Sequence, residues 1–581
     1  MIREVPATIV LKFGSSVLRT QASLPVAVTE VYRHYRSGER VIAVVSAFEG
    51  VTDSLLASVP SKTPDAASLV ALLSTGEITS AAQLSLSLHE AGISAHFIDP
   101  RDLGLIATGD RVNATLSRVS LDKAHARLAE HSVLVVPGFF AAHEDGGLAL
   151  LGRGGSDLTA LFLASELRAR CVLLKDVDGL YESDPAEARR SASSPYRTPP
   201  RRFALADYAT AESLAGPLVQ AKSIRFARER ALPLDVSSVG SSLHTRIGEG
   251  PDVHGPTKVM RPIRVALLGL GTVGRGVLEY LERFPERFDV VAALVRHPEK
   301  HAAGGARIPL LTRSADEVFA REPEIVVEAL PGLEPARSCV GRALRRDLLI
   351  VTANKALIAA EWKHLSPYLA GPRRLLRYAG AVGGSVPMLE TLERLILRTR
   401  IVRLRGVLNG TANFVLDRCA TGDPFATAVR SAQEEGFAEA DSTEDLSGRD
   451  SERKLWILSQ IAFGGPGACE SLAGIDESSC FGDARLPRGR VRLVAEAERT
   501  ADGFRYRVSP QILEETDFLA STRGAENRLE ITTVDGTVHR LQGAGAGRVP
   551  TATAVFADVL DHARIVESDD LVGSASALAT A

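Results

Sequence analysis

Residues 264–278 read RVALLGLGTVGRGVL, and this stretch decides the fold of the second half of the chain. A short apolar strand runs into three glycines, and an apolar pattern with helical spacing follows. Gly269 permits the tight turn, Gly271 lets a pyrophosphate approach the backbone, and Gly274 lets the helix pack on the strand. The phosphates would then lie against N–H groups at a helix N-terminus. The pattern predicts a dinucleotide-binding Rossmann domain, and a plain glycine-rich turn is the alternative.

The second strand of this domain is expected at residues 289–295 and bears on the choice of cofactor. An acidic residue at the end of that strand would hold the ribose 2′-hydroxyl of NAD, but Asp289 stands at its start. Arg296 follows the strand with Lys300 nearby, and its guanidinium would accommodate a 2′-phosphate. The sequence therefore favours NADP(H) over NAD(H). The alternative is that Arg296 is a solvated loop residue.

A dense group of charged residues follows further along, comprising Glu439, Asp441, Asp445, Asp450 and Lys454. If the chain is helical from Asp450 onward, Asp450 and Lys454 lie one turn apart on one face. A carboxylate held beside a lysine fixes its position and tunes its proton affinity, which suits proton transfer to a carbonyl or alcohol. The alternative is a solvated helix start with one surface ion pair, which is worth little.

Four more segments follow the glycine fingerprint: TANKAL at 352–357, VGGSVP at 382–387, GVLNGTANF at 406–414 and GAGAGRVPTA at 543–552. In this order, the stretch from about residue 263 to 575 closely resembles homoserine dehydrogenase. The resemblance implies reversible hydride transfer between NAD(P)H and aspartate 4-semialdehyde, which gives homoserine. It also implies an α+β catalytic domain after the Rossmann domain.

By this resemblance, Lys355 and Lys454 are the catalytic lysines and Asp450 orients Lys454. Glu439 and Asp445 would hold the substrate's ammonium group. A developing alkoxide needs a nearby ammonium, which agrees with these residue types. The implied cofactor contacts are Gly269, Gly271, Thr272, Val273, Gly274, Arg296, Thr352, Lys355 and Gly547. The resemblance also implies a monovalent cation, Na⁺ or K⁺, on the backbone carbonyls of Val382 and Gly384, although Ala379 stands where the family commonly has Glu.

The first half of the chain carries four motifs, at residues 9–16, 41–46, 152–157 and 172–185. The first, IVLKFGSS, is a strand that enters a glycine/serine turn with a lysine suited to phosphate. VIAVVS is typical of a buried parallel strand. GRGGSD precedes a helical pattern, so its amides would cradle an anion while Arg153 grips a carboxylate. VLLKDVDGLYESDP is a strand that breaks into an acidic turn. Taken singly, each is as readily a structural turn as a site.

Together these motifs resemble the catalytic domain of aspartate kinase over about residues 7 to 240. The resemblance implies the amino acid kinase fold, a parallel-rich sheet sandwiched by helices, so the whole chain is expected to be α/β. Lys12 would stabilise the transferred phosphoryl group, and Asp157 would lie beside the reacting carboxylate. The implied aspartate-binding residues are Ser16, Glu77, Arg153 and Ser156, and the implied ATP-binding residues are Asp176, Tyr181 and Asp184. Mg²⁺ would arrive with ATP, because phosphoryl transfer is mainly positioning and charge neutralisation.

The first half also departs from the family. Its first loop is one residue shorter than the usual Lys-Phe-Gly-Gly-Thr-Ser, and Lys175 stands where threonine is usual. A family lysine that contacts nucleotide is replaced by Pro217, for which Lys222 is a candidate substitute. Regulatory domains usually follow the kinase domain, but the interval from Ser238 to Arg264 is too short for one. We therefore expect no ordinary inhibition by lysine or threonine.

Composition sets wider bounds. A chain of 581 residues with 45% hydrophobic residues predicts several domains with large cores. The net charge of −3 indicates no nucleic-acid-binding patch. Five cysteines without CxxC spacing argue for a reducing compartment and against a metal or disulfide framework. The start of the chain lacks a signal-peptide pattern, and no apolar run is expected to reach the ~18 residues of a membrane helix. A cytoplasmic enzyme is predicted, and the family resemblance implies a homodimer or higher homo-oligomer.

The predicted organisation is a kinase domain at 1–245, a linker at 246–262, a Rossmann domain at 263–395 and a catalytic domain at 396–581. The segment from about 543 is expected to return to the nucleotide-binding domain. The sequence predicts a bifunctional enzyme that phosphorylates aspartate and reduces aspartate semialdehyde, in threonine and methionine biosynthesis. One alternative is a dehydrogenase with a degenerate, non-catalytic kinase domain. The other is a pair of binding modules without catalysis.

Overall fold

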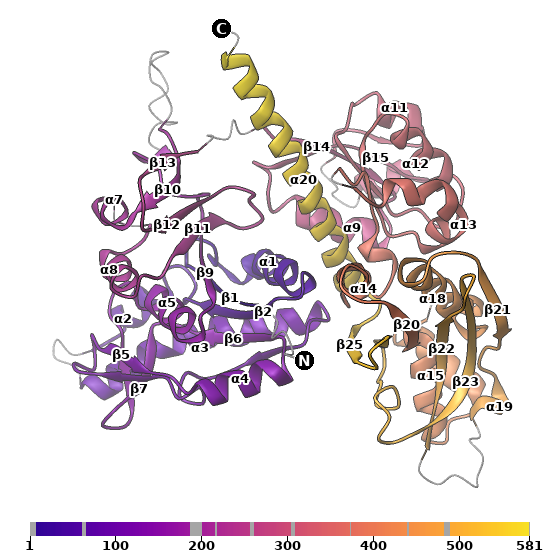
Figure 1. Ribbon diagram of the computed structural model, residues 1–581, viewed down its shortest axis with the longest axis horizontal. Helices are drawn as coiled ribbons and strands as arrows, with labels where there is room; N and C mark the ends of the chain where they lie inside the picture. Colours follow the sequence, from indigo (N-terminus) through magenta and orange to yellow (C-terminus); the bar gives the residue numbers. More distant parts are fainter. Residues whose placement is uncertain are drawn as a thin grey trace. The chain divides into compact units, whose positions relative to one another are not determined.

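The computed structural model describes residues 7–60, 65–185, 200–214, 216, 218–255, 261–303, 308–371, 373–438, 441–480 and 489–579. The chain divides into two compact units. The first comprises Met1–Glu90, Ser94–Met260 and Val566–Ala581, and the second comprises Ala91–Ile93 and Arg261–Ile565. Figure 1 traces both units in the colours of the sequence.

The main sheet of the first unit is rich in parallel strands, as the sequence predicts. Within the described residues, its order is β13-β10-β12-β11-β9-β1-β2-β6-β3. Its strands are β1 Thr8–Phe13, β2 Arg40–Val45, β3 Ala95–Phe97, β6 Val133–Pro137, β9 Arg170–Lys175, β10 Phe203–Asp207, β11 Leu234–Ser238, β12 His244–Gly248 and β13 Val253–His254. β1 pairs in parallel with β2 and β9, and all its residues after Thr8 are buried. Such continuous burial is typical of strands covered on both faces.

Helices pack against this sheet, with α1 beside α3 and α5 beside α8. The helices of the unit are α1 Leu24–Arg36, α2 Val51–Ala57, α3 Ala66–Glu90, α4 Leu121–Glu130, α5 Gly155–Leu167, α7 Tyr208–Ser213 and α8 Ala221–Glu229, with the short 3-10 turn η1 Gln21–Ser23. A smaller sheet has the order β5-β4-β7-β8. Its strands are β4 Ile106–Thr108, β5 Thr115–Arg118, β7 Phe140–His143 and β8 Leu148–Leu150. The layered α/β architecture predicted for this half is confirmed.

The stretch expected to be a linker is partly built into the sheet. β12 pairs antiparallel with β11 and parallel with β10, and β13 pairs antiparallel with β10. The structure therefore differs from the prediction of a linker at 246–262 as far as residue 255. Glycine, serine and proline at 240–251 indicated a loop, but these residues form the turns between short strands.

Helix α3 is the one helix in the described part of the chain that is long and apolar enough, by length and composition alone, to cross a membrane. The sequence of α3 contains no uninterrupted apolar run of ~18 residues, and the helix meets these criteria through its average hydropathy, because its serine, threonine and glycine residues lower that average only weakly. Half of its most apolar window is buried, and Leu84 and Leu88 are fully buried. A core helix of a folded domain has the same properties.

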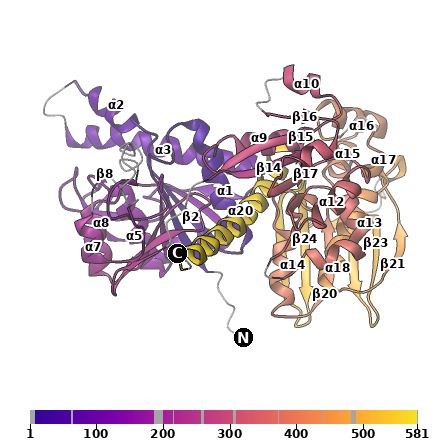
Figure 2. The ribbon, with the colours of Figure 1, turned by 90° about the horizontal axis from the view of Figure 1, so that it is seen from above.

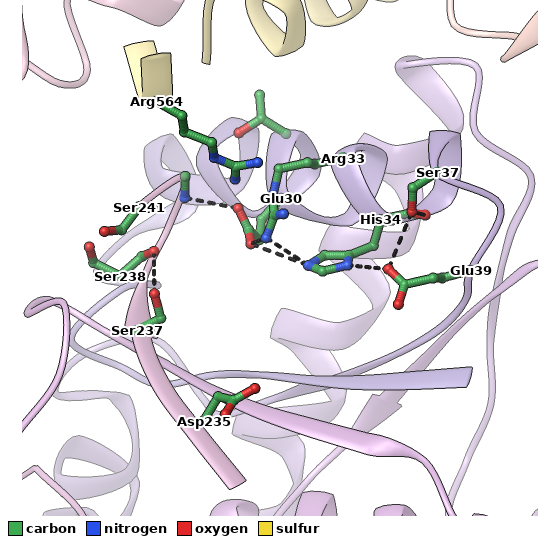
Figure 3. A network of polar contacts seen from close by, with 12 residues as sticks. Glu30, Arg33, His34, Ser37, Glu39, Asp235, Ser237, Ser238, Ser241 and Arg564 are labelled. Carbon is green, nitrogen blue, oxygen red and sulfur yellow. Dashed lines mark hydrogen bonds and ion pairs between the residues drawn. The ribbon is translucent and has the colours of Figure 1, made fainter. Parts of the chain in front are cut away.

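A buried polar network lies on α1. Figure 3 shows Glu30 directed at Arg33 and His34, and His34 directed on toward Glu39. The His34 Nδ1 to Glu39 Oε2 distance is 2.6 Å, and the amide of Gly240 donates to Glu30 Oε2 at 2.9 Å. Burial alone would raise the pKa of Glu30, but Arg33 and His34 together hold it well below its ordinary value. The network ties α1 to the turn after β11.

We expect Glu30→Gln to lower the stability of the first unit by about 3 kcal/mol at pH 7, because it leaves Arg33 and His34 without their buried anion. A carboxyl with a depressed folded-state pKa stabilises the protein above its unfolded value of 4.5, and this contribution is lost as the pH falls below that value. Thermal unfolding at pH 7 and pH 4 should show a difference between parent and variant that shrinks at pH 4. The matched control is Glu130→Gln, whose side chain is 56% exposed in a surface pair. An equal loss at both pH values would contradict the electrostatic explanation.

The first sheet of the second unit is parallel throughout its described strands, in the order β16-β15-β14-β17-β18-β19. The strands are β14 Ile263–Leu268, β15 Phe288–Leu294, β16 Leu311–Thr312, β17 Ile325–Glu328, β18 Leu349–Thr352 and β19 Leu376–Arg377. The helices are α9 Thr272–Leu281, α10 Pro298–Ala303, α11 Ala315–Phe319, α12 Ala336–Leu344 and α13 Lys355–Leu365, with the 3-10 turn η2 Ser366–Tyr368. A side chain on Gly274 would place its Cβ 2.1 Å from the carbonyl oxygen of Gly269. The predicted Rossmann fold is confirmed.

The second sheet of this unit has the order β21-β23-β22-β20-β24-β25 and is mostly antiparallel. Its strands are β20 Ile401–Val407, β21 Gly467–Leu472, β22 Gly489–Arg499, β23 Phe504–Glu514, β24 Glu526–Thr533 and β25 Val538–Ala544. The helices are α14 Met388–Ile396, α15 Gly410–Ala420, α16 Phe425–Glu434, α17 Thr443–Leu446, α18 Arg449–Ala462 and α19 Glu477–Cys480, with the 3-10 turn η3 Ala379–Ala381. Helices α15 and α18 pack on this sheet, as Figure 2 shows from above. This is the α+β arrangement that the sequence predicts.

After β25 the chain enters α20 Arg548–Ala579, whose first turns lie against α9. The hydroxyl groups of Tyr280 and Thr553 are 2.8 Å apart, and the rings of Tyr280 and Phe556 stack at 5.1 Å. Farther along, His562 Nε2 is 2.9 Å from the carbonyl oxygen of Ile350 in β18. The segment that follows the second sheet thus packs on the Rossmann sheet.

The cysteines are not all free thiols. Among the described residues, Cys171 and Cys339 are free and buried, and Cys469 is free and exposed. Cys419, however, is disulfide-bonded. The sequence argued against a disulfide framework and did not predict this one bonded cysteine, because sequence spacing does not report which residues meet in the fold. No group of three or more His, Cys, Asp or Glu side chains arranged for a metal ion occurs in the described ranges.

Candidate active sites

Two lysines and one carboxylate meet where the Rossmann domain faces α18. Gly448 precedes this helix in the left-handed conformation, with φ of 81°, and places Asp450 in its first turn. Lys454 Nζ lies 2.8 Å from Asp450 Oδ2, and Lys355 Nζ lies 2.9 Å from Asp450 Oδ1. Lys454 also donates to the carbonyl oxygen of Leu408 at 2.7 Å. The pair is therefore not a solvated surface pair, because Asp450 and Lys454 are 3% and 6% exposed.

The electrostatics of this cluster keep Asp450 and Lys355 ionised. Burial alone would raise the pKa of Asp450, but Lys454 and Lys355 hold it well below its ordinary value. The Asp450 carboxylate raises the pKa of Lys355, against the effect of burial. Lys355 therefore stays an ammonium through the neutral range. Its side chain is 36% exposed, so it remains within reach of a ligand.

Asn409 links the two acidic positions of the site. Its Nδ2 donates to Asp445 Oδ1 at 2.7 Å and to Asp450 Oδ2 at 2.8 Å. Its Oδ1 accepts from the amide of Ala412 at 2.7 Å and so caps α15. Thr411 Oγ1 donates to Asp445 Oδ2 at 3.2 Å. Neither Asn409 nor Thr411 received a role from the sequence, although an asparagine just before a helical pattern is a recognisable cap signal.

Asp445 and Glu439 are the two residues predicted to bind the ammonium group of the substrate, and the structure describes Asp445 only. Asp445 lies beside the lysine cluster. Its pKa is raised mainly by burial and, to a smaller extent, by the negative charge of Asp450. A cationic ligand would relieve both effects. Glu439 lies outside the described residues.

The predicted cofactor residues gather at the carboxyl edge of the Rossmann sheet. Gly269, Gly271, Thr272, Val273 and Gly274 form the turn from β14 into α9. A Cβ on Gly271 would meet nothing within 4 Å, so the backbone is open to a pyrophosphate. Thr352 ends β18 and donates to the buried carboxyl of Glu328, and Gly547 directly precedes α20.

The end of β15 carries the residue expected to select between cofactors. Arg296 lies two residues past Leu294 and is exposed. Asp289 lies at the start of the strand, paired in register with Arg264, and so at the edge away from the glycine turn.

The predicted cation loop lies next to the chain that follows β25. Val382 is buried, and Gly384 adopts φ of 57°. A Cβ on Gly384 would lie 2.6 Å from the carbonyl oxygen of Ala544 and 3.1 Å from that of Gly545. Two consecutive backbone oxygens of the segment that ends β25 therefore lie beside Gly384, and carbonyl oxygens are the donor type that monovalent cations take. Ala379, the departure from the family, donates its amide to Asp558 Oδ2 at 2.9 Å.

The first unit contains a cavity of about 670 Å³ at the carboxyl ends of β1 and β9. The turn after β1, the N-terminal end of α5 and the acidic turn after β9 surround it. The predicted residues that line it are Lys12, Ser16, Glu77, Ser156, Asp157, Asp176, Tyr181 and Asp184. In open parallel sheets, ligands bind at this edge.

At the floor of the cavity, two lysines contact one carboxylate. Lys12 Nζ is 2.7 Å from Asp157 Oδ1, and Lys175 Nζ is 3.2 Å from Asp157 Oδ2. All three residues are at most 7% exposed. Burial would raise the pKa of Asp157, but Lys12 and Lys175 hold it below its ordinary value. The pKa of Lys175 is lowered to about 8, mainly by burial and, to a smaller extent, by the positive charge of Lys12.

Three other residues complete the comparison with the sequence. Glu77 is buried in the cavity wall, and burial raises its pKa to about 7. Arg153 is exposed and does not belong to the described residues that line the cavity. Lys222 does not line it either, because its Nζ donates to Asn113 Oδ1 at 3.1 Å and to the carbonyl oxygen of Leu151 at 2.9 Å. Neither Arg153 nor Lys222 is therefore among the described residues that line the cavity, and their predicted roles stay predictions.

Comparisons with known proteins agree with both halves. The amino acid kinase family model matches residues 7–198. The homoserine dehydrogenase NAD-binding model matches residues 269–368, and the homoserine dehydrogenase model matches residues 387–560.

Homoserine dehydrogenase of Neisseria gonorrhoeae is 33% identical over 326 residues, which cover 53% of this chain and 74% of that protein. The Mycobacterium tuberculosis enzyme is 34% identical over 324 residues, which cover 52% of this chain and 73% of that protein. A solved homoserine dehydrogenase of Thiobacillus denitrificans is 35% identical with a TM-score of 0.49, and the match covers 54% of this chain and 76% of that one.

The fold and these matches define an NAD(P)-binding oxidoreductase preceded by an amino acid kinase domain. The chain belongs to the homoserine dehydrogenase family. Its domain order is that of an aspartokinase–homoserine dehydrogenase fusion.

Proposed function

We propose that this chain is a bifunctional enzyme of threonine and methionine biosynthesis. Its first unit phosphorylates L-aspartate to 4-phospho-L-aspartate with MgATP. Its second unit interconverts L-aspartate 4-semialdehyde and L-homoserine with NAD(P)H. The observation that carries the second activity is the Lys355–Asp450–Lys454 cluster beside the carboxyl edge of a dinucleotide-binding sheet.

In the dehydrogenase reaction, the bound dinucleotide supplies the hydride that is added to the semialdehyde carbon. The role of this chain is to control charge at the carbonyl oxygen. Lys355 and Lys454 would stabilise the alkoxide that develops there, and one of them would deliver its proton. Asp450 fixes both ammonium groups, and Asn409 fixes Asp450 against Asp445. Asp445 would pair with the substrate's ammonium group.

In the kinase reaction, an oxygen of the aspartate side-chain carboxylate would form a bond to the γ-phosphorus of ATP. The bond from that phosphorus to the bridging oxygen breaks, and ADP leaves with the electron pair. The carboxylate is already an anion, so no general base is needed. The cavity supports this chemistry because it places buried cations, at Lys12 and Lys175, at the carboxyl edge of the sheet. Mg²⁺ would enter as part of the nucleotide substrate.

Two assays test the proposal separately. Purified protein should reduce NADP⁺ when homoserine is added, and should form aspartyl hydroxamate when ATP, Mg²⁺, aspartate and hydroxylamine are present. Hydroxamate formation that requires both ATP and aspartate supports the kinase. NADP⁺ reduction without hydroxamate formation would favour a dehydrogenase with a degenerate kinase domain. This alternative is specific, because Lys175 and Pro217 replace a threonine and a lysine that are usual in the kinase family.

We further propose NADP(H) as the preferred cofactor. Arg296→Ala should raise the KM for NADPH by about 10- to 100-fold, because only this cofactor presents a 2′-phosphate to the guanidinium. The KM for NADH should change less than about twofold, since no charged partner is lost. Arg283→Ala is the matched control, because Arg283 is an exposed arginine past the other end of α9. Equal losses with both cofactors would mean that Arg296 is an ordinary loop residue.

Three further assignments belong to the proposal. A monovalent cation, Na⁺ or K⁺, would bind to the carbonyls of Val382 and Gly384, which the carbonyl oxygens near Gly384 support. We place the enzyme in the cytoplasm, where its small-molecule substrates arise. A homodimer or higher homo-oligomer is expected from the family.

A further inference from the structure

The first unit holds a lysine that its motif does not call for. Lys175 is the last residue of β9, where the related kinases usually have threonine. β9 lies beside β1 with Phe13 paired to Leu174, so Lys12 and Lys175 emerge at the same edge of the sheet. Both line the cavity. The two ammonium groups contact different oxygens of the Asp157 carboxylate, at 2.7 Å for Lys12 and 3.2 Å for Lys175.

The charges at this floor do not balance. Among the buried side chains, Lys12 and Lys175 contribute two cations and Asp157 contributes one anion, while Asp176, which also lines the cavity beside Lys175, is exposed to water. One ion pair would be enough to stabilise the strand edge, and a second buried cation is costly unless an anion is present to meet it. The other buried carboxyl in the cavity wall, Glu77, is only partly ionised at neutral pH because burial raises its pKa to about 7. The excess positive charge therefore fits an anionic ligand that arrives from the cavity.

The other lysine considered for this purpose is committed elsewhere. Lys222 was the sequence candidate to replace the family lysine that is Pro217 here, a position outside the described residues. Its Nζ donates to Asn113 and to the carbonyl of Leu151, away from the cavity. Among the described residues that line the cavity, Lys175 is thus the cation that accompanies Lys12.

We infer that Lys175 is a catalytic residue of the phosphoryl-transfer site, where it acts with Lys12 on the terminal phosphoryl group of ATP. The inference rests on the proposed kinase function. As the γ-phosphorus moves from the bridging oxygen of ADP to the aspartate carboxylate, negative charge spreads over its peripheral oxygens. Two ammonium groups held by one carboxylate neutralise that charge without rearrangement. Asp157 then positions both lysines.

The titration of Lys175 gives the proposal a pH signature. The groups that face it are Lys12 on β1, Asp157 on α5, Glu77 on α3 and the adjacent Asp176. Burial and the charge of Lys12 lower its pKa to about 8, so the free enzyme loses this cation as the pH rises through 8. The kcat/KM for ATP should therefore fall on the alkaline side of about pH 8. In Lys175→Arg the guanidinium stays charged, and this alkaline limb should be absent.

The test compares Lys175→Met, Lys175→Thr and Lys175→Arg with the parent in the hydroxamate assay. Met and Thr should lower kcat by about 10²-fold, and Arg should restore part of that loss. Binding of a non-hydrolysable ATP analogue should weaken by about tenfold while ADP binding changes less than about twofold, because Lys175 acts on the terminal phosphoryl group. Lys123→Met, which changes an exposed lysine on α4 that does not line the cavity, should leave all these values unchanged.

The outcomes separate this inference from the proposed function. A parent protein that forms no hydroxamate overturns the proposed kinase and the role of Lys175 together. An active parent with an equally active Lys175→Met variant overturns the role of Lys175 alone. Equal weakening of ADP and of the ATP analogue, together with a lower unfolding temperature, would assign Lys175 to the structure of the site and also overturn the inference. Lys175→Thr guards against misfolding, because it restores the residue usual in related kinases.

Discussion

Replacing Lys454 with alanine is expected to lower kcat for NADP-dependent oxidation of homoserine by about 10²–10⁴-fold, the scale of a proton-transferring or charge-stabilising group. That loss corresponds to about 3–5 kcal/mol of transition-state stabilisation. The ammonium of Lys454 is fixed by Asp450 and by the carbonyl of Leu408, so no other described cation replaces it at the same point. Affinity for NADP⁺ should be nearly unchanged, because the glycine turn at 269–274 does not include this residue. Steady-state kinetics and a direct cofactor titration check both statements.

Two variants of the same helix control this prediction. Arg453→Ala removes the neighbouring cation, which pairs with the exposed Glu444 of α17, and should retain at least half of the parent activity. Lys454→Arg keeps the positive charge, but a planar guanidinium replaces the compact ammonium. We therefore expect this variant to keep only part of the parent activity. Activity of Lys454→Ala within threefold of the parent would exclude Lys454 as a catalytic residue.

The sequence predicted the local parts of this site and could not predict how they meet. The i, i+4 spacing was enough to place Lys454 beside Asp450, because a helix has fixed geometry. The contact of Lys355 with Asp450 joins residues far apart in the chain and depends on how α13 packs against α18. The bridging role of Asn409 was equally hidden, since its amide reaches two carboxylates that come together only in the fold.

The kinase half shows where motif resemblance is less informative. The motifs located Lys12 and Asp157, because a strand end and a helix start are local features. Lys175 looked like a departure from the family in the sequence, yet it lines the cavity and contacts Asp157. Arg153 matched the motif, but it is exposed and is not among the described residues that line the cavity. Side-chain direction at a strand end or in a glycine turn depends on the neighbouring strands, which the motif does not contain.

Lys12→Met should lower the rate of aspartate phosphorylation by about 10²–10³-fold, because it removes the cation closest to Asp157 from a buried site where charge cannot be screened by water. The ammonium of Lys175 would then be the one buried cation left in contact with Asp157, and the buried charges at this end of the cavity would balance. The charge of Lys12 is one cause of the low pKa of Lys175, so that pKa should rise in the variant. The alkaline limb of the kinase pH profile should therefore move to higher pH while the maximum rate falls.

The dehydrogenase activity of the same chain provides the internal control for that experiment. Lys12 belongs to the first unit and the Lys355–Asp450–Lys454 cluster to the second, so homoserine oxidation by Lys12→Met should stay within about twofold of the parent. Lys123→Met, an exposed lysine on α4, should change neither activity. A fall in both activities would indicate loss of folded protein rather than loss of a catalytic group. Retention of full kinase activity would show that Lys12 does not act on the transferred phosphoryl group, and the cavity would then need a different ligand.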